Sequence, residues 1–387
     1  MDSSEWKALN AISICRTLVA GFFWLFVPLY MFSAHLPPAD IGLAIAIGTL
    51  IRLFTAPFIG TLNDLLGTRR LMQASLLGMS LGSAGLALTA PATLSLAVIL
   101  FPLCLFLLSN NSLMLSLEAS LYKKTTNTQV AGHVGEYNAF KALAWGIGIL
   151  ISGYLMLTYP FNDIAGGLSV FCLLVLGLTV LVQHTVRVEF DLARYRRELG
   201  RPMVLVLSIL IFIQSFEWGT EGVVLSPLYS QQAGLDSAQM GLVTFGANLA
   251  VAIASVWVGR SVSARRKGAQ PKAVRGVLLS GLLFAAAGSF LIFFVHDLAG
   301  MLAARVIYNL GEVLIGVSFG YLIGTLFSQS HVGGTNGVLN LISNAGIATA
   351  ALAAGAFMGF GLGVPYLMTG MLFLCAIVLV WFSVKRL

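Results

Sequence analysis

The chain has 387 residues, of which 58% are hydrophobic and only 10% are charged. Soluble domains have about 25% charged residues, so this composition excludes a water-soluble globule and indicates an integral membrane protein. The net charge of +7 does not require a nucleic-acid partner. Basic residues concentrate in the cytoplasmic segments of membrane proteins and attract anionic lipid headgroups there.

Twelve mostly apolar runs follow one another along the chain, each near the length of about 20 residues that a helix needs to cross a bilayer. The first run is too long for the core of a signal peptide and lacks a small-residue cleavage site, so we expect a retained span. The four cysteines lie inside these runs, where they behave as small hydrophobic residues. The predicted spans are 8–32, 39–60, 71–91, 94–118, 137–158, 165–186, 202–229, 237–259, 276–295, 298–325, 335–360 and 366–384.

The basic residues outside the spans are distributed unevenly between the two sides of the membrane. If the N-terminus is cytoplasmic, the Lys and Arg residues outside the spans all lie in segments on the cytoplasmic side, and the turns on the other side carry none. The positive-inside rule therefore predicts that both termini are cytoplasmic. The expected location is the inner membrane of a bacterium.

A sequence repeat relates the two halves of the chain. The stretch "PLYMFSAHLPPADIGL" (28–43) aligns without a gap with "PLYSQQAGLDSAQMGL" (227–242), so that Gly42 matches Gly241. The charged stretch "RVEFDLARYRRELGR" lies between the sixth and seventh spans. We therefore predict one six-helix unit written twice as a parallel repeat, with a bundle at 1–186, a cytoplasmic linker at 187–201 and a second bundle at 202–387.

The segment after the second span reads "GTLNDLLGTRR" (60–70). It resembles the signature loop of the major facilitator superfamily, usually G-x-L-x-D-[RK]-x-G-[RK]-[RK], although Leu65 and Thr68 replace basic residues of that pattern. The resemblance implies an all-α membrane protein of two six-helix bundles related by a pseudo-two-fold axis along the membrane normal. It further implies alternating access and a gating role for the loop, whose alternative is a simple topological anchor. The residues concerned are Gly60, Asp64, Gly67, Arg69 and Arg70.

Eight charged residues lie inside the predicted spans, where charge is expensive unless it faces protein or water. Counting from the predicted span ends places four of them in the cytoplasmic half of the membrane, namely Arg16, Arg52, Glu118 and Lys141. The other four, Glu217, Glu221, Arg305 and Glu312, are expected between the middle and the outer half. The first repeat thus holds mostly cations and the second mostly anions. This division favours a substrate with both charge signs or an amphiphile over a neutral sugar, unless the residues only pair among themselves.

Glutamates of the second repeat are candidates for proton coupling. Glu217 and Glu221 stand four apart and are expected on one helix face, where two carboxylates in low dielectric cannot both ionise cheaply. Glu312 is the rival carrier, and our expected order is Glu217, then Glu312, then Glu221. Glu118 is expected to act mainly with the cations of the first repeat.

Polar and aromatic residues complete a candidate substrate cavity around Arg16, Arg52, Lys141 and Arg305. Some of them could instead mediate helix packing or anchor the helices at the membrane interface. These candidates are Trp24, Tyr30, Asn110, Asn111, Trp218, Tyr308, Asn309, Asn340 and Asn344.

The function that fits these features best is proton-coupled secondary transport of a small amphoteric or amphiphilic organic solute. No phosphate-binding G-x-x-x-x-G-K-[ST] motif, metal-ligand spacing or catalytic constellation is present in the sequence, so we expect neither an enzyme nor a cofactor. The alternatives are a proton antiporter that exports cationic drugs and, less favoured, a membrane scaffold or receptor. The expected partners are a small-molecule substrate, protons and membrane lipids, and the expected state is a monomer. Import and export remain open.

Overall fold

The computed structural model describes residues 3–91, 94–124, 130–182, 201–263, 270–326 and 332–383. Within these ranges the chain forms twelve long helices and no strand, which confirms the predicted all-α fold class. The helices are α1 (Ser3–Ser33), α2 (Pro38–Leu66), α3 (Thr68–Ala87), α4 (Leu96–Lys124), α5 (Val130–Leu155), α6 (Phe161–Leu176), α8 (Pro202–Pro227), α9 (Ser237–Ser263), α10 (Gln270–Phe294), α11 (Leu298–Leu326), α12 (Val332–Phe357) and α13 (Val364–Ser383).

Short turns of other helical types continue three of these helices. They are the 3-10 turns Gly177–Leu181 and Met358–Phe360, and the π turn Leu228–Gln232. Among the described residues, ten helices are long and apolar enough to cross a membrane. The remaining two long helices are α3 and α5, and the chain is a multi-pass membrane protein.

The end of α2 differs from the sequence prediction. The span was expected to stop at residue 60 and to leave a loop, but α2 continues to Leu66. Gly67 alone separates α2 from α3, with φ of 81°, a value that glycine adopts far more readily than other residues. The motif therefore consists mainly of a helix end followed by a glycine turn.

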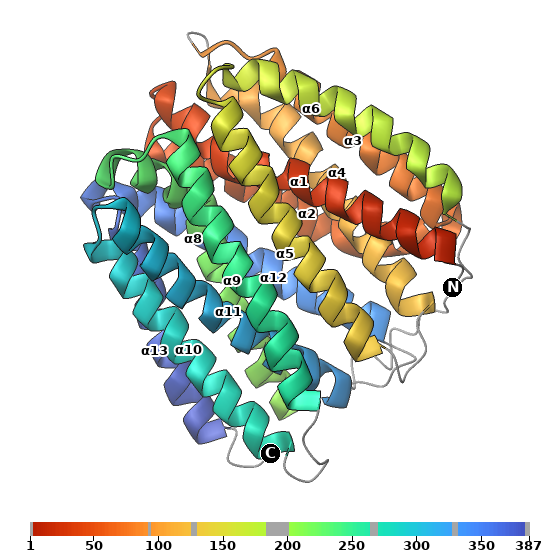
Figure 1. Ribbon diagram of the computed structural model, residues 1–387, viewed down its shortest axis with the longest axis vertical. Helices are drawn as coiled ribbons and strands as arrows, with labels where there is room; N and C mark the ends of the chain where they lie inside the picture. Colours follow the sequence, from red (N-terminus) through yellow and green to blue (C-terminus); the bar gives the residue numbers. More distant parts are fainter. Residues whose placement is uncertain are drawn as a thin grey trace.

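The chain ends define two ends of the bundle. The helices run roughly parallel or antiparallel, and the N and C marks lie toward the same end (Figure 1). We call this the terminal end and the opposite end the far end. The linker residues 187–200 lie outside the described residues, so the predicted division into two bundles at 187–201 stays a prediction.

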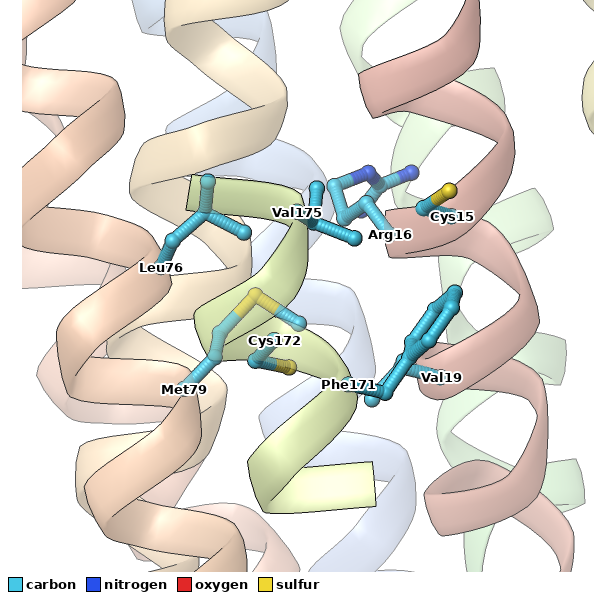
Figure 2. A pocket seen from close by; sticks show the side chains of 8 residues that line it. All are labelled: Cys15, Arg16, Val19, Leu76, Met79, Phe171, Cys172 and Val175. Carbon is cyan, nitrogen blue, oxygen red and sulfur yellow. The ribbon is translucent and has the colours of Figure 1, made fainter. Parts of the chain in front are cut away.

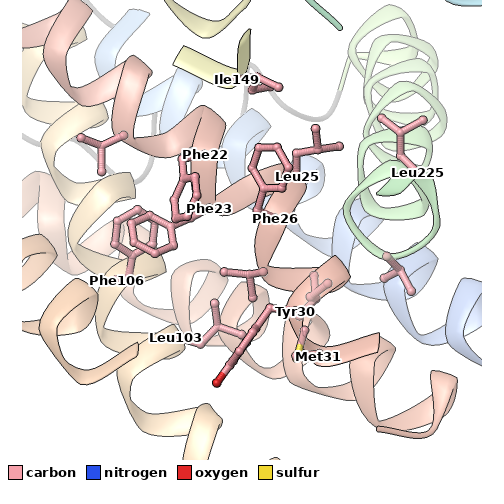
Figure 3. Close-up of a cluster of buried hydrophobic side chains, with 14 of the residues drawn as sticks. Phe22, Phe23, Leu25, Phe26, Tyr30, Met31, Leu103, Phe106, Ile149 and Leu225 are labelled. Atoms are coloured by element: carbon pink, nitrogen blue, oxygen red, sulfur yellow. The ribbon is translucent and has the colours of Figure 1, made fainter. Parts of the chain in front are cut away.

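Two apolar cores divide the molecule unevenly. The larger core joins buried residues of α1 to α6 with residues from the far ends of the later helices, such as Tyr229, Val243 and Ala354. Figure 3 shows its centre, where Phe22 and Phe26 of α1 lie between neighbouring helices. The smaller core is built only from α8, α10, α11, α12 and α13, toward the terminal end. The two sets of six helices thus share one core at the far end, whereas the last six have a separate core at the terminal end.

Two pairs of helices form the main contacts between the first six and the last six helices, α5 with α9 and α2 with α12. We call them the α5–α9 seam and the α2–α12 seam. In Figure 1, α5 and α9 lie side by side in front, and α2 and α12 are fainter and farther back. The seams therefore lie on opposite faces of the bundle.

Equivalent glycines of the repeat lie at these two seams. A Cβ added to Gly42 of α2 would come 2.5 Å from the Ala351 carbonyl oxygen of α12. A Cβ added to Gly241 of α9 would come 3.1 Å from the Ile149 carbonyl oxygen of α5. Because the matched glycines occupy matched contacts between the two sets of helices, the structure agrees with the pseudo-two-fold relation predicted from the repeat.

Candidate functional site

Charged and amide side chains gather near the middle of the helices. Arg16 and Arg52 lie close to the midpoints of α1 and α2. Their expected place in the cytoplasmic half of the membrane stays a prediction. We call the following set the mid-layer: Arg16, Arg52, Asn110, Lys141, Glu217, Glu312 and Asn344.

The two arginines of the mid-layer bind side-chain amides. Arg16 donates a hydrogen bond from Nη1 to Oδ1 of Asn110 on α4, at 2.8 Å. Arg52 donates from Nε at 3.2 Å and from Nη2 at 2.6 Å to the single Oδ1 of Asn344 on α12. The second contact crosses between the first six and the last six helices, so Arg52 links the two sets near the midpoints of α2 and α12.

Lys141 of α5 completes the cationic side of the mid-layer. Its Nζ lies 3.7 Å from Oε1 of Glu118, and the two side chains are 30% and 29% exposed. Arg16 is a charged neighbour of both Lys141 and Arg52. Arg16 is therefore close to two other cations, and Glu118 is the carboxylate beside Lys141.

The last six helices supply the acids. Glu217 is fully buried, and its charged neighbours are Glu312 and Arg305. The Tyr308 hydroxyl also faces it, but among the described residues neither oxygen of Glu217 makes a hydrogen bond of good geometry. A buried carboxylate in this position is costly as an anion, which makes Glu217 the least stabilised acid of the mid-layer.

Glu221 lies in a different environment from Glu217. It forms an ion pair with Arg305, and both side chains are largely buried. The Arg305 guanidinium also lies 5.3 Å from the centre of the Tyr308 ring, a cation–π arrangement. Glu217 and Glu221 were expected to act as a pair on one face. The structure instead pairs Glu221 with Arg305 and makes Glu312 the acidic neighbour of Glu217.

Glu312 of α11 is bonded to an aromatic residue. Trp218 donates from Nε1 to its Oε1 at 2.5 Å, and Trp218 is 43% exposed although it lies near the middle of α8. An accessible indole next to a carboxylate is a chemical pair suited to a positively charged group.

Several other candidates lie away from this set of charges. Tyr30 is buried in the apolar core and donates to the Thr89 carbonyl at 3.0 Å. Trp24 packs against Trp145, with ring centres 6.2 Å apart, and against the position of Gly222 on α8. Trp24 therefore lies at a contact between the two sets of helices. Sequence reasoning missed Trp145 and Gly222 as its partners, and the glycine-rich composition of α5 was the only signal near them.

The remaining amides are mostly buried among helices. Asn111 and Asn309 are each 3% exposed. Asn340 accepts a hydrogen bond through Oδ1 from Nδ2 of Asn344 at 2.6 Å. It therefore extends the Arg52–Asn344 contact along α12.

The gating motif is only partly described. The side chain of Asp64 and the surroundings of Gly60 lie outside the described part of the structure. Arg69 is half-buried and Arg70 is exposed at the start of α3. A gating role for these residues stays a prediction.

A small pocket also lies inside the first six helices, between α1, α3 and α6 (Figure 2). Arg16 reaches its edge, and the other lining residues are apolar or sulfur-containing: Cys15, Val19, Leu76, Met79, Phe171, Cys172 and Val175. Such a lining offers no polar site besides the arginine that already belongs to the mid-layer.

Comparisons with known proteins agree with this architecture. The family model described as Major Facilitator Superfamily matches residues 9–273 and 207–386. Among solved structures, the human organic anion transporter MFSD10 (TETRAN) is similar over 98% of this chain and 100% of that one, with a TM-score of 0.69 and 17% sequence identity. At this identity the likeness shows the fold alone. A search of curated proteins found no match. The chain therefore belongs to the major facilitator superfamily of membrane transporters.

Proposed function

We propose that this protein is a secondary transporter that carries a small amphoteric organic solute by alternating access. The observation that carries the proposal is the division of charge in the mid-layer. Arg16, Arg52 and Lys141 come from the first six helices, whereas Glu217 and Glu312 come from the last six. A solute with one anionic and one cationic group would bridge the two sets and favour their closure around it.

The anionic group of the solute is assigned to the arginines. Arg16 and Arg52 are charged neighbours, and the hydrogen bonds described for Arg52 go to the neutral oxygen of Asn344. A guanidinium binds a carboxylate more strongly than an amide oxygen, because both partners are ionised.

The cationic group is assigned to Trp218 and Glu312. The indole is accessible and the carboxylate is held by it. This assignment also supports the second candidate function, export of cationic drugs, in which the same pair would bind a lipophilic cation and the arginines would serve only the gate.

The arrangement of the cores supports an inward-facing state. The two sets of helices share an apolar core at the far end, and the cytoplasm lies at the terminal end if the basic segments are inside. Access to the mid-layer is then from the cytoplasm, and opening of the far end would complete the cycle.

A matched set of probes tests the substrate class. The set is 4-(aminomethyl)benzoate, benzoate, benzylamine and benzamide, which share one benzene ring and carry both charges, a negative charge, a positive charge and no charge, respectively. Thermal-shift measurements on the purified protein should rank the zwitterion first, because it alone satisfies both sides of the mid-layer. A preference for benzylamine over the zwitterion would favour the cation exporter. Equal responses to all four probes would contradict both assignments.

Proton coupling is assigned to Glu217, because it is buried and has no well-formed hydrogen bond in the described part of the chain. Glu217→Gln is permanently neutral, so it should abolish transport driven by a pH gradient in proteoliposomes while preserving solute exchange at equal pH. Glu312→Gln tests the rival carrier. If both variants and Glu221→Gln keep pH-driven transport, coupling through these acids is wrong.

A further inference from the structure

The α2–α12 seam contains a polar contact near the midpoints of its two helices that the described residues of the α5–α9 seam do not repeat. On α12, Asn344 accepts two hydrogen bonds from Arg52 of α2. At similar depth in the other seam, Gly146 of α5 lies against Asn248 of α9. The Asn248 amide donates to the Thr244 carbonyl of its own helix at 2.9 Å. Among the described residues, a charged group therefore joins the α2–α12 seam and not the α5–α9 seam.

The geometry at Arg52 is incomplete for a guanidinium. The edge formed by Nε and Nη2 can make two parallel bonds to the two oxygens of a carboxylate. Here both donors share the one Oδ1 of Asn344, at 3.2 and 2.6 Å. Within the described ranges no carboxylate pairs with Arg52, and its charged neighbour is another cation, Arg16. In the described part of the chain, the Arg52 guanidinium is thus bonded to a neutral oxygen.

We propose that Asn344 is a placeholder for the anionic group of the solute. In the empty transporter its amide oxygen occupies Arg52 and ties α2 to α12. A carboxylate, or another anion with two oxygens, displaces Asn344 from the Nε–Nη2 edge, and the contact between the helices is lost in the same step. This inference rests on the proposed function. It identifies Asn344 as the residue that sets the affinity for the anion and whose displacement releases the contact between α2 and α12.

When an anion displaces Asn344 from Arg52, few hydrogen-bonding groups of α12 lose their partners. Asn344 also donates from Nδ2 to Oδ1 of Asn340 at 2.6 Å and to the Asn340 carbonyl at 2.9 Å. These bonds do not involve Arg52, so the Asn344 amide keeps its donors satisfied after displacement. Only its oxygen loses partners, while Arg52 exchanges a neutral acceptor for an ionised one.

The placeholder makes two opposite predictions for substitutions at one position. If Asn344 must leave before the anion binds, the observed affinity is reduced in proportion to the fraction of Arg52 that is free. Removing the amide should therefore strengthen anion binding. Placing a carboxylate on the same position should weaken it, because that carboxylate would occupy Arg52 permanently.

The test measures benzoate binding to the purified full chain in lipid nanodiscs, by calorimetry and by thermal shift, with benzamide as the neutral isostere. Asn344→Ala should bind benzoate about fivefold more tightly, the effect of removing one competing hydrogen bond. Asn344→Asp should bind it at least about tenfold more weakly. The matched control is Asn248→Ala, which removes an amide of similar depth from the other seam and should leave benzoate affinity unchanged. Benzamide should have no effect on any of the proteins.

Unchanged or weaker benzoate binding in a folded Asn344→Ala variant would overturn the proposal, as would tighter binding in Asn344→Asp or no benzoate response in any protein. Asn344→Ser gives the same test if the alanine variant melts at a lower temperature than the parent. The proposed function can fail separately. If benzoate follows the predicted pattern but the zwitterion has no advantage over the other probes, the substrate class is wrong and the placeholder stands. If the zwitterion is preferred and benzoate affinity does not change with the residue at position 344, only the proposal that Asn344 is a placeholder is wrong.

Discussion

Two arginines within the membrane-spanning helices are held in opposite ways. Arg305 forms an ion pair with Glu221 and lies over Tyr308, all within the last six helices. In the part of the chain that the structure describes, Arg52 binds the neutral oxygen of Asn344, and that contact crosses to the other set of helices. An ion pair buried inside one set of helices is not easily exchanged, whereas an amide across a seam is. The comparison suggests that Arg305 maintains structure and that Arg52 is available to a ligand.

The largest expected effect concerns stability at Arg305. Glu221→Gln leaves a buried guanidinium without its counterion, which should destabilise the protein by about 3–5 kcal/mol. Glu118→Gln is the comparison, because its pair with Lys141 is about a third exposed and should contribute less than about 1 kcal/mol. Melting of both variants in the same lipid or detergent would measure the difference. Equal losses of stability in the two variants would show that the Arg305–Glu221 pair stabilises the protein no more than the Lys141–Glu118 pair.

Arg52→Lys should affect binding more than stability. Lysine keeps the charge but cannot present the two-donor edge that a carboxylate binds, so benzoate affinity should fall by about 1.5–3 kcal/mol, the range for hydrogen bonds to charged groups. Calorimetry on the purified variant measures this loss. If Arg52→Lys binds benzoate as tightly as the parent protein, Arg52 acts only as a point charge. The proposed difference, in which Arg52 binds a ligand and Arg305 maintains structure, would then be unsupported.

The matched glycines compare the two seams at the far end. A Cβ on Gly42 would lie 2.5 Å from a backbone oxygen, and one on Gly241 would lie 3.1 Å from a backbone oxygen. Gly42→Val should therefore disfavour closure of the far end by about 1–3 kcal/mol, the usual range for overpacking, and Gly241→Val should do so less. Accessibility of Trp24→Cys to an impermeant thiol reagent added from the far side reports the opening, in a chain whose native cysteines are replaced. The control is Gly167→Val, since a Cβ at Gly167 meets nothing within 4 Å. Equal accessibility in all three would show that glycine packing does not set closure.

The smallest effect is expected at Asp64, on the same helix as Arg52. Asp64→Asn removes an anion proposed to interact with basic groups or a helix end, a contribution of about 0.3–1 kcal/mol at an exposed site. The inward-facing population should rise by the corresponding factor, seen as greater labelling of cysteines placed at the cytoplasmic side of the mid-layer. No change would indicate that the motif is only a topological anchor.

The sequence was sufficient for the architecture because apolar runs of spanning length and a long repeat are strong signals. The twelve helices were predicted from these signals, and the repeat matched Gly42 with Gly241, but it did not say which helices the two glycines contact. Helix ends were less predictable. Helix α2 ends at Leu66, later than predicted, because no residue between Gly60 and Gly67 breaks a helix.

The charged residues of the candidate site could be listed from the sequence, but their partners could not. Spacing along one helix suggested that Glu217 and Glu221 act together, yet Glu221 forms the ion pair with Arg305, whereas Glu217 has Glu312 as an acidic neighbour besides Arg305. The contact between Arg52 and Asn344 joins helices far apart in the chain, and no local pattern encodes it. Such choices depend on how helices pack against one another, which periodicity alone does not determine.

The most direct test of the account measures distances across both seams with and without an anion. Spin labels at residues 58 and 338 would span the α2–α12 seam, and labels at 140 and 257 would span the α5–α9 seam, each in a chain whose native cysteines are replaced. Double electron–electron resonance should show that benzoate, but not benzamide, shifts the α2–α12 distance. The same shift should occur without ligand in Asn344→Ala, and the α5–α9 distance should change less. The claim that Arg52 and Asn344 form the ligand-sensitive contact would be contradicted if benzoate left the α2–α12 distance unchanged. It would also be contradicted if benzoate changed the distances across both seams equally.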